Sequence, residues 1–68
     1  MNDEALNMSI RKFLKTVGVN SQREIEQAVA KALADGTLAD SDVFPARMTL
    51  EIGRLKVRVD FDGEIRLT

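Results

Sequence analysis

The stretch "FPARMTLEIGRLKVRVDF", residues 44–61, decides the fold because the spacing of apolar residues changes there. Before it, apolar residues recur every three or four positions, which is typical of amphipathic helices. Within it they alternate with polar residues, which is typical of half-buried strands. Pro45 marks the change because the residue before a proline, Phe44, favours an extended conformation. The sequence therefore predicts a helical first part and a pleated second part.

The alternation inside this stretch predicts a β-hairpin. The apolar residues of one face are Met48, Leu50, Ile52, Leu55, Val57, Val59 and Phe61. A two-residue turn at Gly53 and Arg54 sets the register. Its apolar pairs are Ile52–Leu55, Leu50–Val57 and Met48–Val59, and its charged pairs are Glu51–Lys56 and Arg47–Asp60. Opposite charges thus meet on the outer face, which supports this register.

The segment "FDGEIRL", residues 61–67, predicts a second turn and a third strand. A two-residue loop at Asp62 and Gly63 would put the next apolar residues on the wrong face. A three-residue loop with a bulge restores the alternation, pairing Val59 with either Ile65 or Leu67. The expected sheet is a three-stranded antiparallel meander.

Two helices are expected before the sheet, over residues 3–17 and 22–34. Asn2 caps the first, and Gly18 provides a left-handed C-terminal cap. Ser21 and Glu24 form a capping box at the start of the second, which ends before Gly36. The apolar stripes are Leu6, Ile10, Phe13, Leu14 and Val17, then Ile25, Ala28, Val29, Ala32 and Leu33. The predicted fold is a single α+β domain of order ααβββ, with both helices on one face of the sheet.

The junction "KTVGVNSQREIEQAV", residues 15–29, resembles the turn and second helix of a DNA-reading helix-turn-helix. In such units an apolar residue follows the turn glycine, as Val19 follows Gly18. However, the step into the capped helix is one residue too long, and the reading helix would face phosphates with Glu24 and Glu26. A simple αα-hairpin is therefore the favoured interpretation.

Length and composition predict a homodimer. The chain has 68 residues, three aromatic residues and no cysteine, so an aliphatic core must hold it together without disulfides. Such a core rarely supplies more than about 3–5 kcal/mol. Two copies can join sheet edges, pack helices together, or exchange segments through the connector of residues 35–45.

Catalysis and cofactor binding are not expected. The chain has no histidine and no cysteine, so the usual proton shuttle and the usual nucleophile are both missing. We predict no cofactor, no metal and no small-molecule substrate. Asp35, Asp40 and Asp42 offer oxygen ligands that would suit calcium, but no glutamate closes the loop, and a solvated connector is favoured.

Net charge and hydropathy argue against nucleic acid and membranes as partners. The net charge is −1, which gives no general attraction to nucleic acid or to acidic membranes. No apolar run is long enough to span a bilayer, and the N-terminus has no signal-peptide core. We therefore expect a cytoplasmic protein-interaction or regulatory module whose protein partner is unidentified.

Two basic surfaces are candidate interaction sites. Met8 lies among the cations of the first helix and makes an adaptable partner-binding spot together with Arg11, Lys12 and Lys15. The alternative is weak nucleic-acid binding through the outer sheet face and the start of the first helix. Its sheet-face residues are Arg47, Lys56, Arg58 and Arg66.

The segments "NMSIRKFLKTVGVNSQREIEQAV" and "VDFDGEIRL" carry a family resemblance. Through them the chain resembles a family of short uncharacterised proteobacterial proteins, over nearly its whole length. The resemblance implies a small stand-alone α+β protein, homodimeric and without an assigned activity. It transfers no catalytic or ligand-binding residue to any position of this sequence.

Overall fold

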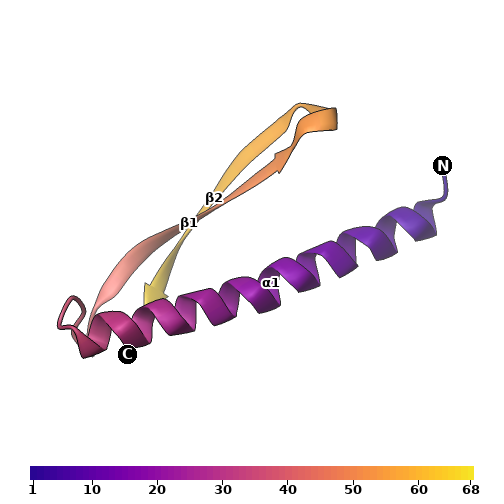
Figure 1. The fold of residues 1–68 in the computed structure, drawn as a ribbon. Helices are drawn as coiled ribbons and strands as arrows, with labels where there is room; N and C mark the ends of the chain where they lie inside the picture. Colours follow the sequence, from indigo (N-terminus) through magenta and orange to yellow (C-terminus); the bar gives the residue numbers. More distant parts are fainter. The chain divides into compact units, whose positions relative to one another are not determined.

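A computed structural model describes all 68 residues, which form one long helix and one β-hairpin (Figure 1). Helix α1 spans Asp3–Ala34, strand β1 spans Val43–Ile52, a short 3-10 turn spans Gly53–Leu55, and strand β2 spans Val57–Arg66. The chain divides into two compact units, Met1–Thr37 and Leu38–Thr68. The fold is α+β, of order αββ rather than the expected ααβββ.

Both ends of α1 follow the predicted capping. The Asn2 side chain accepts a hydrogen bond from the backbone N–H of Ala5 at 3.0 Å, and Asp3 and Glu4 lie in the positively polarised first turn. At the other end, Gly36 has a φ of 83°, in the left-handed region that glycine adopts without steric cost. The predicted positions of the first and last caps are thus confirmed.

The prediction of two helices is wrong, because α1 continues without a turn through residues 18–21. Gly18 does not have a positive φ and Ser21 is not an N-cap. A glycine inside a helix costs only about 1 kcal/mol relative to alanine. A cost of this size at one position does not break the helix. Neither the αα-hairpin nor the helix-turn-helix is present.

The predicted hairpin is present, but its register differs by two residues. Strands β1 and β2 pair antiparallel along their whole lengths, from Val43 opposite Arg66 to Ile52 opposite Val57. The predicted pairs, in which Leu50 faced Val57, are therefore wrong. A shift of two residues keeps every side chain on its face, so alternation alone cannot distinguish a two-residue loop from a four-residue one.

The four-residue loop of residues 53–56 connects the two strands in this register. The Lys56 N–H donates to the carbonyl of Gly53 at 3.2 Å, and Lys56 has a φ of 53°. The longer loop places Thr49 opposite Asp60 and Arg47 opposite Asp62. Polar pairs in the strands thus compensate for a left-handed lysine in the loop.

The third strand does not exist, because β2 runs straight through Asp62 and Gly63. Ile65 pairs with Phe44, so both expected partners of Val59 across a last turn are wrong. Apolar and polar residues alternate without a break from Val57 to Ile65 when Gly63 is counted among the apolar residues. Just beyond β2, the Leu67 N–H donates to the carbonyl of Asp42 at 3.2 Å.

The pairing gives the hairpin one apolar and one polar face. The apolar face consists of Phe44, Ala46, Met48, Leu50, Ile52, Val57, Val59, Phe61, Gly63 and Ile65. The polar face carries the charged residues of both strands. No side chain anywhere in the chain is fully buried. A single helix or a two-stranded sheet has no second layer of its own to cover its apolar face.

Candidate functional site

The first candidate surface is the apolar stripe of α1, which is continuous from end to end. Leu6, Val17 and Ala28 follow one another at intervals of eleven residues, or three helical turns, so the two predicted stripes are in phase. The exposed fractions of Leu6, Ile10, Phe13 and Leu14 are 45, 46, 54 and 56 %. Sequence reasoning found the residues of this stripe but missed its continuity.

The second candidate surface is the apolar face of the hairpin. Its Met48 and Phe61 lie directly opposite each other and expose 44 and 57 % of their surfaces. Large apolar side chains gathered on one face, rather than scattered singly, mark a contact surface. Each unit therefore presents an apolar face of its own.

The third candidate surface is the basic cluster of Met8, Arg11, Lys12 and Lys15, and α1 does bring these predicted residues together. They lie within two turns of the helix, on the side away from the stripe, and Met8 is 66 % exposed. None of the three cations forms an ion pair within the chain. No carboxylate occurs between Glu4 and Glu24 to neutralise them.

Sequence reasoning missed one neighbour of the basic cluster. Val19 lies three helical turns after Met8 on the same side of α1, and it is 51 % exposed. The prediction of a helix end at Gly18 removed Val19 from this surface. The eleven-residue interval from Met8 is the signal that identifies it.

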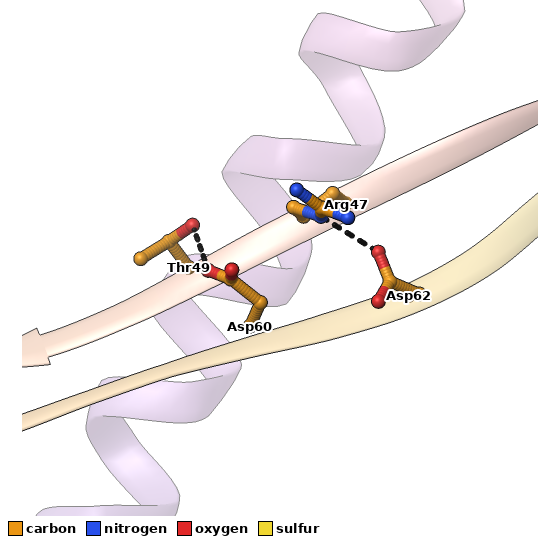
Figure 2. Close-up of polar contacts among 4 residues, drawn as sticks. All are labelled: Arg47, Thr49, Asp60 and Asp62. Atoms are coloured by element: carbon orange, nitrogen blue, oxygen red, sulfur yellow. Dashed lines mark hydrogen bonds and ion pairs between the residues drawn. The ribbon is translucent and has the colours of Figure 1, made fainter.

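The polar face of the hairpin is a set of cross-strand pairs (Figure 2). Arg47 Nε donates to Asp62 Oδ1 at 2.7 Å, and Thr49 Oγ1 donates to Asp60 Oδ1 at 2.7 Å. The Arg47 and Asp62 side chains are 64 and 65 % exposed, so this ion pair contributes at most about 1 kcal/mol. These contacts join β1 and β2 on the polar face of the hairpin.

The four residues expected to contact nucleic acid do not form one basic patch. Arg47 pairs with Asp62, and Arg58 lies opposite Glu51. Arg66 NH1 lies 3.7 Å from Glu64, and Lys56 belongs to the loop rather than to a strand. The polar face carries four carboxylates among its three guanidinium groups: Glu51, Asp60, Asp62 and Glu64, with Arg47, Arg58 and Arg66.

The acidic connector is occupied by turn contacts. The Asp35 carboxylate accepts hydrogen bonds from the Thr37 hydroxyl at 2.6 Å and from the Thr37 N–H at 3.0 Å. Both bonds lower the pKa of Asp35 from its ordinary value, and the bond from the hydroxyl has the larger effect. Asp42 Oδ2 accepts from the N–H of Ala39 at 2.8 Å. No three histidine, cysteine or acidic side chains gather as metal ligands would.

Comparison with known proteins gives one match. A family profile described as a family of unknown function covers residues 1–68. No curated protein and no solved structure matches the chain. No helix combines the length and the apolar character that crossing a membrane requires.

Proposed function

We propose that this chain, which belongs to the DUF6494 family of unknown function, is a non-enzymatic homodimer that serves as a protein-interaction or regulatory module. The observation that carries the proposal is that no side chain is buried, although both units present an apolar face. A second copy offers the same faces and can cover them symmetrically.

The energetics of each unit support association. A helix in a protein owes most of its stability to the packing of its apolar face, and an isolated two-stranded hairpin is only marginally stable. Full burial of a large aliphatic or aromatic side chain contributes about 1.5–3 kcal/mol. Covering the half-exposed residues of the α1 stripe therefore adds about 1 kcal/mol for each side chain. No disulfide and no metal is available as a substitute source of stability.

The roles of the carboxylates support the absence of catalysis. General acid–base chemistry without histidine or cysteine would fall to Asp and Glu. Asp60 and Asp62 are engaged by Thr49 and Arg47, and Asp35 stabilises its own turn. Each of these groups has a structural partner in place of a substrate.

Within the module, we assign partner recognition to the basic cluster. Three unpaired cations around an exposed methionine suit a protein partner with an acidic, partly apolar surface. The mixed charges on the hairpin give no comparable support to a nucleic-acid interface.

Sedimentation equilibrium of the full chain tests the homodimer. We expect a species of twice the 7.6 kDa protomer mass at micromolar concentration. Leu14→Glu places a charge on the stripe and should weaken the dimer by about a hundredfold, because the charge would lose its hydration in the interface. Gln27→Glu adds the same charge on the opposite side of α1 and should leave the dimer intact. A 7.6 kDa species at high micromolar concentration refutes the homodimer.

Recovery of partners from the native host tests the basic cluster. Lys12→Glu with Lys15→Glu should abolish the recovery of proteins that the unmodified chain retains. Arg54→Glu with Lys56→Glu, a double reversal of the same charge in the hairpin loop, is the control and should retain them. If the double reversal retains every partner, the basic cluster is not the recognition surface.

A further inference from the structure

The cations of the basic cluster lie between two exposed apolar side chains. Met8 precedes them and Val19 follows them on the same side of α1, and these two residues are 66 and 51 % exposed. Their separation of eleven residues is three helical turns, or about 16.5 Å along the axis. This side of α1 therefore presents an apolar residue, a group of cations and a second apolar residue in that order.

Negative charge limits the length of this surface. Glu4 and Glu26 lie eleven residues before and after Lys15, so both lie on its side of α1, each about 16.5 Å away along the axis. A long anionic partner, such as a nucleic-acid duplex or an acidic membrane, would meet these carboxylates as well as the cations. Repulsion between like charges disfavours such a partner. A short acidic partner contacts the cations alone.

A second copy of this chain is a poor match for the surface. Two basic clusters face to face would set cations against cations, and this repulsion opposes association. The hairpin has carboxylates, but Asp62 is bonded to Arg47 and Asp60 to Thr49 of the same chain, both at 2.7 Å. Complementary carboxylates are better supplied by a different protein.

The interval between Met8 and Val19 favours a helix over a strand as the partner element. Residues on one face of a strand recur about every 6.6 Å, so like-facing positions fall near 13 and 20 Å and miss the interval. A helix reproduces it, because residues eleven positions apart face the same side. Acidic residues in the turns between two such positions would lie level with Arg11, Lys12 and Lys15.

From these observations we propose that the basic cluster and Val19 bind a helix of another protein, whose acidic middle turns lie between two apolar residues eleven positions apart. The inference rests on the proposed role of the basic cluster in partner recognition, and it names the kind of partner. The acidic residues of that helix pair with cations that have no ion-pair partner in this chain. Its apolar residues cover Met8 and Val19.

Titration of the full chain with a synthetic helical peptide tests the proposal. The probe has two leucines eleven positions apart, and glutamates three, four, seven and eight positions after the first leucine, in a background of alanine and glutamine. We expect saturable binding that weakens as salt is added. Replacing both leucines by alanine should weaken it about tenfold. A peptide of the same composition in scrambled order is the control and should bind equally weakly.

Substitutions in the chain test the two apolar positions. Met8→Gln and Val19→Gln remove apolar contacts and preserve α1, because glutamine is a good helix former. Each should weaken binding of the probe about tenfold. Leu55→Gln is the matched control, since Leu55 is 67 % exposed in the turn between the strands, and it should leave binding unchanged. Circular dichroism of each variant confirms that the helix is intact.

The outcomes separate this inference from the proposed function. Binding that Lys12→Glu with Lys15→Glu abolishes, but that Met8→Gln and Val19→Gln leave unchanged, overturns the bracketed helix and leaves the basic cluster as a recognition surface. A probe that does not bind overturns the inference in the same way. So does tighter binding of a DNA duplex, or of vesicles of equal parts phosphatidylcholine and phosphatidylglycerol. Binding that survives the double reversal overturns the inference and the proposed role of the basic cluster together.

Discussion

Gly36 is the one glycine whose backbone conformation requires glycine. Its φ of 83° lies in the left-handed region, where a Cβ clashes with the backbone. We expect Gly36→Ala to lower the free energy of unfolding by about 1–2 kcal/mol, even though the space around the position is open. Thermal unfolding at fixed protein concentration measures the loss. An unchanged melting temperature would mean that the helix ends in another way.

The turn after α1 predicts a pH effect at Asp35. Its pKa is lowered by the Thr37 hydroxyl and by the Thr37 N–H. Because the pKa falls on folding, the stabilisation is present above the pKa of the unfolded carboxyl and is lost as the pH falls through the lower pKa of the folded one. Thr37→Val removes the hydroxyl and should raise the pKa of Asp35 towards its ordinary value. Carboxyl NMR titration of both proteins decides, and identical pKa values would contradict the role of the hydroxyl.

At the scale of single residues, the sequence correctly predicted a residue's role where that role depends only on the local backbone. Asn2 and Gly36 were predicted as caps because an N-terminal acceptor and a left-handed residue are local needs. Gly18 and Ser21 are also of residue types that favour helix caps, but neither of them caps a helix. Glycine and serine are tolerated inside a helix at a cost of about 1 kcal/mol or less, so their presence does not determine a break.

At the scale of elements, Gly63 distinguishes the observed strand from the predicted turn. It lies in β2 without a positive φ, and nothing approaches its Cβ position within 4 Å. Gly63→Thr should therefore raise the free energy of unfolding by about 0.5–1 kcal/mol, since threonine favours strands. The same substitution at Gly36 should destabilise the protein. If Gly63→Thr also destabilises, residues 62 and 63 form a turn after all.

The hairpin shows which part of an element alternation can specify. The change of period at Pro45 predicted a first strand from Ala46 to Ile52 and its division into two faces, but β1 begins earlier, at Val43. Charge did not distinguish the two registers, because both place opposite charges across from Arg47 and Glu51. The predicted register offers Asp60 and Lys56, and the observed one offers Asp62 and Arg58. The dipeptide Asp62-Gly63 is a common turn signal, and here the continuous alternation on both sides of it prevails.

At the scale of the whole molecule, the proposed homodimer predicts that stability depends on concentration. Folding coupled to association shifts with protomer concentration by mass action. A tenfold increase should raise the melting temperature by about 5 °C for two chains of this length. Differential scanning calorimetry over two decades of concentration measures the slope. A melting temperature independent of concentration would contradict a dimer that dissociates on unfolding.

The candidate surfaces differ in how far the sequence could define them. The basic cluster lies within two turns of one helix, so helical spacing alone assembles Met8, Arg11 and Lys15. The set proposed for nucleic acid spans two strands and a loop, and its members acquire carboxylate neighbours only once the register is known. A surface contained in one element is thus predictable, whereas a surface shared between elements is not.

Pro45 has a consequence for growth of the sheet. The bond from the Leu67 N–H to the Asp42 carbonyl shows that even-numbered residues of β1 direct their backbone groups towards β2, so position 45 directs its groups outward. A proline there has no N–H to offer an incoming strand. The outer edge of β1 therefore lacks one donor and is a poorer template for an incoming strand than the outer edge of β2, which has no proline.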